Sequence, residues 1–433
     1  ADLKLLHEDT TISIAGATIN LSGAITDKAT IETVLGYTTG TVKIATITED
    51  KADLASIALA SGTFAKASLA TANITVSDSV NKTEATAIDA YGSGTVTLTT
   101  ASGSSTDLKA LNDDTTISIA GSLLTLSGTV DESTVATVNT YSTKTVTVSD
   151  ITDSIANVKK IYDVKPAGAG QNGVDMSAAD IILTDSVTDI STLDTTLTYT
   201  TGTVTLQTVN ESKADLAKLA SDAGAYADVK LAGADITVSD SVNKTEATAI
   251  DAYHGGSGTV TLTTASGSST DLKALNDDTT ISIAGSLLTL SGTVDESTVA
   301  TVNTYSTKTV TVSDITDSIA NVKKIYDVKP AGAGQNGVDM SAADIILTDS
   351  VTDISTLDTT LTYTTGTVTL QTVNESKADL AKLANAGGAY GDVRLTGTAI
   401  TVSDAVNKTE ADAIDAYHGG SGTVTLTKFA GTT

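Results

Sequence analysis

The chain has 433 residues, with 52 acidic and 25 basic side chains and a formal net charge of −27. This charge disfavours nucleic acid as a partner, because phosphates are bound by Lys and Arg. Cysteine is absent, so disulfides and thiol sites are excluded, and no apolar run reaches the ~18–20 residues of a membrane span.

The sequence is built from repeats. The stretch 92–220 recurs letter for letter as 256–384, an offset of 164 residues. A shorter period lies within it. Segments such as TVTLT and ITVSD alternate aliphatic residues with Thr and Ser, which predicts half-buried strands. The expected strand starts are spaced alternately by about 22 and about 28–36 residues and are Ile19, Thr41, Ile74, Thr95, Leu123, Thr145, Ile181, Thr203, Ile236, Thr259, Leu287, Thr309, Ile345, Thr367, Ile400 and Thr423.

A short helix is predicted after most strands. Segments 81–91, 131–141, 152–162 and 210–220 begin with a polar cap, carry an acidic residue near the first turn and then place apolar residues three or four apart. Strand–helix–strand units of this length predict parallel pairing with right-handed crossovers.

The longer coils contain an extra apolar segment just before the next strand, for example TISIAG at 116–121, GVDMSAAD at 173–180 and ADVKLAGAD at 227–235. Two neighbouring parallel strands cannot be joined by two or three residues. We therefore expect this segment to be a strand of a second sheet that meets the next coil at a corner.

These elements predict an α/β or mainly β solenoid, in which parallel strands stack in coils of alternating length with short helices between them. Tryptophan is absent and phenylalanine occurs twice, so small aliphatic side chains would fill the interior in thin layers. We expect 1–433 to be one continuous solenoid, with 1–18 as an incomplete coil and internal units 19–73, 74–122, 123–180, 181–235, 236–286, 287–344, 345–399 and 400–433.

The two ends of the chain resemble the two parts of one coil. Residues 1–16 match 106–121, and 423–427 repeat the strand at 95–99. Seven residues lie between Thr99 and Asp107, and seven would lie between Thr427 and Asp2 of a following copy. We expect the C-terminal strand of one subunit and the N-terminal segment of the next to complete a shared coil, which builds a head-to-tail homopolymer. The alternative is a section of a longer repeat protein. The expected interface residues are Leu3, Leu5, Leu6, Thr11, Ile12, Ile14, Thr423, Val424, Thr425, Leu426, Thr427 and Phe429.

Tyrosine ends the helix of every short coil. Such rings either cover the edge of the core and keep their hydroxyls in water, or form a surface that stacks on carbohydrate or bundles laterally. The structural interpretation is the simpler of the two. The eight residues are Tyr37, Tyr91, Tyr141, Tyr199, Tyr253, Tyr305, Tyr363 and Tyr417.

Aspartate directly follows several strands, and stacked carboxylates would repel one another unless a cation such as Ca²⁺ bridged them. The candidates for such a site are Asp150, Asp185, Asp314 and Asp349. The sequence has no EF-hand loop and no glycine-rich calcium repeat, and helix capping accounts for the same residues. Ca²⁺ is therefore the one cofactor considered, and none is assigned.

Thr-x-Thr pairs such as Thr95 and Thr97 resemble the flat threonine arrays of ice-binding solenoids. Threonine is also common on exposed strands, and Asn20 and Lys43 interrupt the array.

The chain is not expected to be an enzyme, and no catalytic residue is predicted. His7, His254 and His418 do not form a zinc-binding pattern. Almost every acidic cluster occurs at least twice, whereas a single active site would break the repeat. Even the irregular loop 163–176 is copied at 327–340.

The stretches ITVSDSVNKTEATAIDAY at 74–91 and TLTYTTGTVTLQTVNESKADLAKL at 196–219 are similar to the Thr/Asp/Ala-rich tandem repeats of very large bacterial surface proteins, especially cyanobacterial ones. The similarity covers essentially the whole chain through repeat style. It implies secretion, an extracellular or cell-surface location, and a structural or adhesive role. Cell-surface polysaccharide is a further candidate partner, through the tyrosine surface. The expected function is a structural subunit of an extracellular filament or surface fibre. A passive spacer of a giant adhesin is the alternative, and an ice-binding solenoid is the third.

Overall fold

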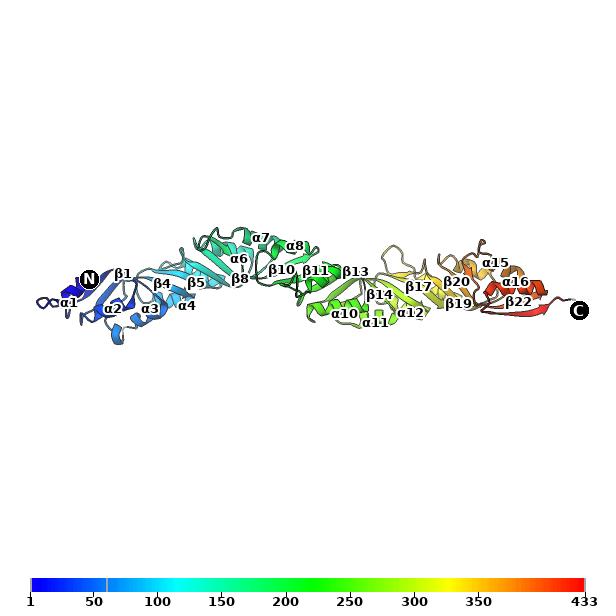
Figure 1. Ribbon diagram of the computed structural model, residues 1–433, viewed down its shortest axis with the longest axis horizontal. Coiled ribbons are helices and arrows are strands. Elements are labelled where there is room, and N and C mark those ends of the chain that lie inside the picture. Colours follow the sequence, from blue (N-terminus) through cyan, green and yellow to red (C-terminus); the bar gives the residue numbers. More distant parts are fainter. Residues whose placement is uncertain (1, 60, 432–433) are drawn as a thin grey trace. The chain divides into compact units, whose positions relative to one another are not determined.

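The computed structural model describes residues 2–59 and 61–431, which contain 16 α-helices, three 3₁₀ helices and 23 strands. Every strand pair whose register is defined is parallel. Strands and short helices alternate along the chain (Figure 1). The predicted α/β solenoid arrangement of parallel strands with short helices between them is therefore confirmed.

Sixteen main strands of seven to nine residues begin within one residue of the predicted starts. They are β1 (Ile19–Ile25), β2 (Val42–Glu49), β4 (Asn73–Val80), β5 (Val96–Gly103), β7 (Leu123–Val130), β8 (Thr145–Asp153), β10 (Asp180–Val187), β11 (Val204–Glu211), β13 (Asp235–Asn243), β14 (Val260–Gly267), β16 (Leu287–Val294), β17 (Thr309–Asp317), β19 (Asp344–Val351), β20 (Val368–Glu375), β22 (Ala399–Val406) and β23 (Thr423–Phe429).

The extra segments of the longer coils form short strands, but the prediction of a second sheet is wrong. In β5, Val96 and Thr97 pair with β6, and the last four residues pair with the start of β7. β6 and β7 therefore lie one after the other along the same edge of β5. They are successive pieces of one line rather than neighbours, so a short connection can join them without reversing the chain. The short strands are β3 (Ala67–Ser68), β6 (Ile117–Ser118), β9 (Gly173–Asp175), β12 (Val229–Lys230), β15 (Ile281–Ser282), β18 (Gly337–Asp339) and β21 (Val393–Arg394).

The helices begin where the sequence provides side-chain caps. At α4, the Asn81 side chain accepts a hydrogen bond from the Glu84 N–H, and the Glu84 carboxylate accepts one from the Asn81 N–H. The helices are α1 (Asp2–Glu8), α2 (Lys28–Leu35), α3 (Lys51–Ala58), α4 (Lys82–Asp89), α5 (Ser105–Asp113), α6 (Glu132–Asn139), α7 (Ile155–Asp163), α8 (Ser191–Thr196), α9 (Lys213–Leu219), α10 (Lys244–Asp251), α11 (Ser269–Asp277), α12 (Glu296–Asn303), α13 (Ile319–Asp327), α14 (Ser355–Thr360), α15 (Lys377–Leu383) and α16 (Lys408–Asp415), with 3₁₀ helices at Gly62–Phe64, Ala252–His254 and Ala416–His418.

Each coil buries one face of its strand against helices and leaves the other face in water. In β5, Val96, Leu98 and Ala101 are buried, while Thr97 and Thr99 are exposed. The helices α4 and α5 lie against this strand. The core is therefore a row of thin aliphatic layers, and each layer is closed by the coils on either side of it.

The turns into the strands bring neighbouring coils into close contact. A Cβ atom at Gly94 would lie 2.0 Å from the carbonyl oxygen of Ala72 in the preceding turn. Any side chain there would force the two turns apart, which explains glycine in the GSG turn.

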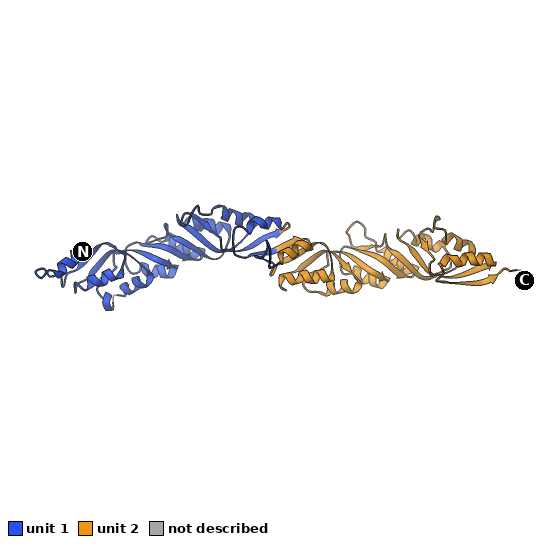
Figure 2. Ribbon diagram, viewed as in Figure 1, with its two compact units in different colours: residues 1–186, 190–207, 221–230 blue, residues 187–189, 208–220, 231–433 orange. Residues whose placement is uncertain are grey.

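The described chain divides into two compact units (Figure 2). Unit 1 comprises 1–186, 190–207 and 221–230, and unit 2 comprises 187–189, 208–220 and 231–433. The first copy of the duplicated stretch lies mostly in unit 1 and the second lies in unit 2. That 1–433 is one continuous solenoid stays a prediction. Within the described ranges, no helix combines the length and apolar character required to cross a membrane.

Candidate interaction surfaces at two strand edges

A complete coil in unit 1 shows what normally covers a strand. β5 pairs with β4 along one edge and with β6 and β7 along the other. Helix α5 buries Leu108 and Leu111 against the coil, and Val96 and Leu98 of the strand each expose only 1 % of their surface. The same arrangement recurs around β14, which has the same sequence.

The strand β23 repeats TVTLT but has a single neighbour among the described residues. It pairs with β22, where Ile400 opposes Val424 and Val402 opposes Leu426. Val424 and Leu426 are only half-buried, although the matching residues of β5 are covered, and Phe429 exposes 63 % of its surface. Among the described residues, the edge of β23 that faces away from β22 therefore has no paired strand, and it lies beside an apolar inner face.

The N-terminal segment leaves a second set of apolar side chains uncovered. Leu6 exposes 37 % of its surface and Ile12 exposes 48 %, whereas their counterparts Leu111 and Ile117 expose 1 % and 5 %. Leu5 is also largely exposed, and no residue of α1 is fully buried. In the internal coil, the corresponding residues of α5 and β6 are covered by β5.

The local conformation of this segment is nevertheless the same as inside the molecule. The Asp9 carboxylate accepts hydrogen bonds from the N–H and hydroxyl of Thr11 at 2.7 and 2.6 Å, as Asp114 does from Thr116 at 2.8 and 2.7 Å. The hydroxyl and the N–H of Thr11 lower the pKa of Asp9. The turn around Asp9 is thus the same as the turn around Asp114 that precedes β6.

Leu3 and Ile14 fix the segment to its own coil. Both pack partly against the core cluster of Ile19, Val34 and Val42. The helix α1 is therefore held beside β1 and α2.

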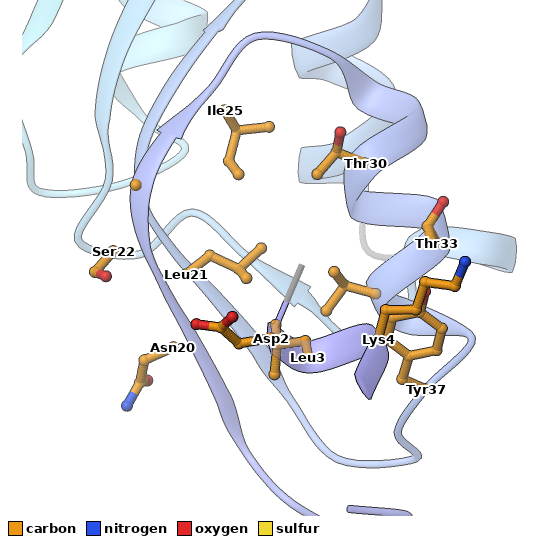
Figure 3. Close-up of a pocket in the computed structure, with 12 residues that line it drawn as sticks. Asp2, Leu3, Lys4, Asn20, Leu21, Ser22, Ile25, Thr30, Thr33 and Tyr37 are labelled. Carbon is orange, nitrogen blue, oxygen red and sulfur yellow. The ribbon is translucent and has the colours of Figure 1, made fainter. Parts of the chain in front are cut away.

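An open cleft of about 680 Å³ lies between α1, β1 and α2 (Figure 3). Its apolar lining includes Leu3, Leu21, Ile25 and Val34, and Tyr37 lies beside Lys4 at one side. The matching groove between α5 and α6 measures about 260 Å³ and has no lining residue from β7. Inside the molecule, the preceding strand therefore covers the residues that this cleft exposes.

The predicted interface residues fall into these two sets. Leu3 to Ile14 lie on α1 and the segment after it in unit 1, and Thr423 to Phe429 form β23 in unit 2. Thr427 is tied to its own chain by a hydrogen bond of 2.6 Å from its hydroxyl to the Val402 carbonyl. Sequence reasoning missed the cleft, because its size depends on how α1 folds back beside β1.

The eight predicted tyrosines are all buried or partly buried. The rings of Tyr199 and Tyr162 stack with centroids 4.1 Å apart, and Tyr363 and Tyr326 stack in the same way. Lys165 Nζ lies 4.4 Å from the Tyr162 ring centroid. Sequence reasoning missed Tyr162 and Tyr326, although the repeated IANVKKIY segment places both at the end of a helix. These contacts favour a role at the edge of the core over an open stacking surface.

The aspartates considered for Ca²⁺ accept hydrogen bonds from protein groups. Asp185 and Asp349 accept from the first N–H of α7 and α13 at 2.7 and 2.8 Å, so each caps a helix of the preceding coil. Asp150 and Asp314 accept from the adjacent serine hydroxyls at 2.7 and 2.8 Å. Within 2–59 and 61–431, no group of three or more His, Cys, Asp or Glu residues is placed to hold a metal ion.

The histidines serve the turns. His254 Nε2 lies 2.9 Å from the Asp251 carboxylate, and its Nδ1 accepts from the N–H groups of Gly256 and Gly258 at 3.1 and 3.2 Å. His418 repeats this arrangement with Asp415, Gly420 and Gly422. His7 stacks on Tyr37 with ring centroids 4.5 Å apart.

The outward threonines form rows that are soon interrupted. Thr75, Thr97 and Ser118 are aligned across three strands. In another row, Ile346 and Arg394 flank Thr369. The rows are therefore not the uniform array that the ice-binding resemblance implies.

Ion pairs link the helices of consecutive coils. Lys51 Nζ lies 2.8 Å from a Glu84 carboxylate oxygen, and the pairs Lys213–Glu246 and Lys377–Glu410 repeat the contact at 2.8 and 2.9 Å. The hydrogen bond to Glu84 raises the pKa of Lys51, and the hydrogen bonds from Lys51 and from the Asn81 N–H lower the pKa of Glu84. Burial, and then the charge of Asp379, raises the pKa of Glu375.

No protein-family model matches the chain, and no curated protein is similar to it in sequence.

Proposed function

We propose that the chain is a structural subunit of an extracellular filament or surface fibre, in which β23 of one copy and the α1 segment of the next complete one coil. The observation that carries the proposal is the half-exposed state of Val424 and Leu426 on an unpaired strand edge. The same residue types at the same register are covered in β5 and β14.

The edge of β23 lacks the usual protection against strand addition. Its inner positions are apolar, Lys428 is its only charged residue, and seven residues run without a proline. Edges of this kind pair readily with a further strand, because doing so satisfies backbone groups and covers apolar side chains together.

The N-terminal segment supports a second copy of the chain as the occupant. The edge of β5 that faces away from β4 is covered by α5, β6 and the start of β7. The segment 2–13 matches the α5–β6 part of this cover and already holds the Asp9 turn, while Leu6 and Ile12 lack a neighbour. The two surfaces differ from each other, so the contact is heterologous and successive copies add without closing a ring.

The net negative charge of the chain is compatible with fibres that grow end to end and do not associate side by side. A net charge of −27 repels parallel fibres and keeps them soluble, whereas an apolar, hydrogen-bonded joint is little affected by that repulsion. The proposed extracellular location is supported by the likeness in repeat style to bacterial surface proteins.

The test is assembly of the purified protein as a function of concentration. We expect sedimentation to detect growing polymers and negative-stain microscopy to show fibres. Val424→Lys places a charge in the joint and is expected to abolish both. Circular dichroism and the thermal transition of dilute samples establish that the variant is folded.

Thr261→Lys is the matched control. It adds the same charge at an exposed position of the internal strand β14, so assembly should be unaffected. A wild-type chain that stays monomeric at every concentration overturns the proposal and leaves the spacer as the better interpretation. Polymers of Val424→Lys equal to wild type overturn the role of this edge.

A further inference from the structure

Phe429 occupies a position of β23 that holds a buried aliphatic residue in each of the seven internal strands compared below. In β23 it opposes Val406, as Ala101 opposes Val80 in β5. It is 63 % exposed, while the residues at the same register of the internal strands are each 0 % exposed: Ile47, Ala101, Ile151, Val209, Ala265, Ile315 and Val373.

The internal coils show where a side chain at this position is directed. Ala101 has Leu124 of β7 as its partner in the next coil, and Ala265 has Leu288 of β16. The counterpart of Leu124 at the other edge is Ile19, because Ile19 opposes Val42 of β2 as Leu124 opposes Val146 of β8. A copy seated by this register therefore places Phe429 beside Ile19, which is itself buried and is followed along β1 by Asn20 and Leu21, two residues that line the cleft.

The size of the cleft matches the change from a small to a large side chain. A phenylalanine in place of Ala101 would overpack a closed layer. The cleft beside β1 has about 680 Å³, against about 260 Å³ for the matching internal groove, and Leu21, Ile25 and Val34 line it. A phenyl ring finds space and apolar contacts there that the internal coils do not offer.

We propose that Phe429 of one copy inserts into the cleft between α1, β1 and α2 of the next copy and is the aromatic anchor that sets the register of the joint. This inference rests on the proposed end-to-end assembly. The partner is a second copy of this chain, since the cleft and the ring are matched by the register of the internal coils. Anchors of this type dominate the energy of an interface because they are fully desolvated on binding.

The absence of tryptophan gives a direct probe of the anchor. In Phe429→Trp, the only indole of the molecule reports on this position. We expect its emission to shift to shorter wavelength, and its quenching by acrylamide to fall, as concentration rises and polymers form. An emission that stays water-like in polymers detected by sedimentation overturns this inference and leaves the proposed function intact. Absence of polymers in wild type overturns both.

Two substitutions locate the contact. Phe429→Ala should raise the critical concentration for assembly by about 10- to 100-fold, since it removes a large buried side chain. Thr30→Phe, on the cleft wall, fills the site and should also impair assembly, and the double variant should be no worse than the stronger single one. Leu59→Ala removes an apolar residue that is 72 % exposed and lies outside both surfaces, so it should change nothing. Additive effects, or equal losses for Leu59→Ala and Phe429→Ala, contradict the proposal.

Discussion

β5 and β23 carry the same TVTLT letters and meet the preceding strand in the same register, yet one strand is covered and the other is half open. In contrast, the two identical copies that contain β5 and β14 are covered alike. The burial of a strand in this fold therefore depends on the next coil. The strand's own apolar side chains only make that burial favourable in free energy. Two sets of variants test this dependence on the neighbouring coil, and a third tests an ion pair between the helices of consecutive coils.

The greatest difference in stability should appear between an internal strand and the edge strand. Leu98→Ala should lower the free energy of unfolding by about 2–5 kcal/mol, because it opens a cavity in a closed layer. Leu426→Ala should cost clearly less in dilute monomer, because that side chain is already half in water. Urea unfolding followed by circular dichroism measures both values.

The same pair of variants carries its own control. At concentrations where wild type assembles, the cost of Leu426→Ala should increase, whereas that of Leu98→Ala should stay constant. Equal costs in dilute monomer would mean that β23 is as well covered as β5.

A smaller effect compares the two identical copies. Ser122 and Ser286 are fully buried and donate to the carbonyls of Leu98 and Leu262. Replacing either by Ala should lower the free energy of unfolding by about 1 kcal/mol, which is the typical net value of such a hydrogen bond. The two changes should be equal and additive in urea unfolding. Unequal costs would show that the copies differ in stability despite identical sequences.

The smallest effect concerns acid stability. The pKa of Glu84 is lowered in the folded chain, so its contribution to stability is complete above its ordinary value of 4.5 and is lost as pH falls through the lowered pKa. The two side chains are 40 % and 35 % exposed, so water screens the pair and the effect is small. Lys51→Met should therefore flatten the loss of stability between pH 5 and 3, as followed by urea midpoints.

The opposite sign at Glu375 makes this measurement specific. Burial raises the pKa of Glu375, so its ionisation weakens the fold as pH rises through that pKa. Glu375→Gln should improve stability at neutral pH relative to acid. A Lys51→Met variant that steepens the acid limb would contradict the assignment of the ion pair.

The periodic parts of the fold could be predicted because they depend on local pattern. Aliphatic residues alternating with Thr locate the strand starts to within one residue, and the cap before Glu84 locates α4. The second sheet could not be judged from such patterns. Whether Ile117 lies beside Val96 or turns a corner depends on pairing between residues 21 positions apart, which leaves no local signal.

The candidate site was predictable in its sequence and not in its shape. The likeness of 2–13 to 107–118 points to the N-terminal surface, and that of 423–427 to 95–99 points to β23. The preserved Asp9 turn shows that like sequences fold alike. The cleft depends on Leu3 and Ile14 packing onto the first coil, and the anchor depends on the contrast between Phe429 and Ala101 at one register. Neither the cleft nor the anchor can be recognised from the periodicity of apolar residues or from the spacing of the repeats.

The segments 92–220 and 256–384 are identical in sequence. If β4 paired with β14 instead of β5, it would therefore meet the same side chains that it meets in β5. A nascent or refolding polypeptide can thus pair one whole copy out of place, although closing the longer loop adds an entropy penalty of about 2 kcal/mol over the correct one. Ribosomal synthesis removes the ambiguity by time, since the first copy can fold before the second has been made. Chains refolded from denaturant lack that head start, and a share of them should be trapped with the wrong partner strands.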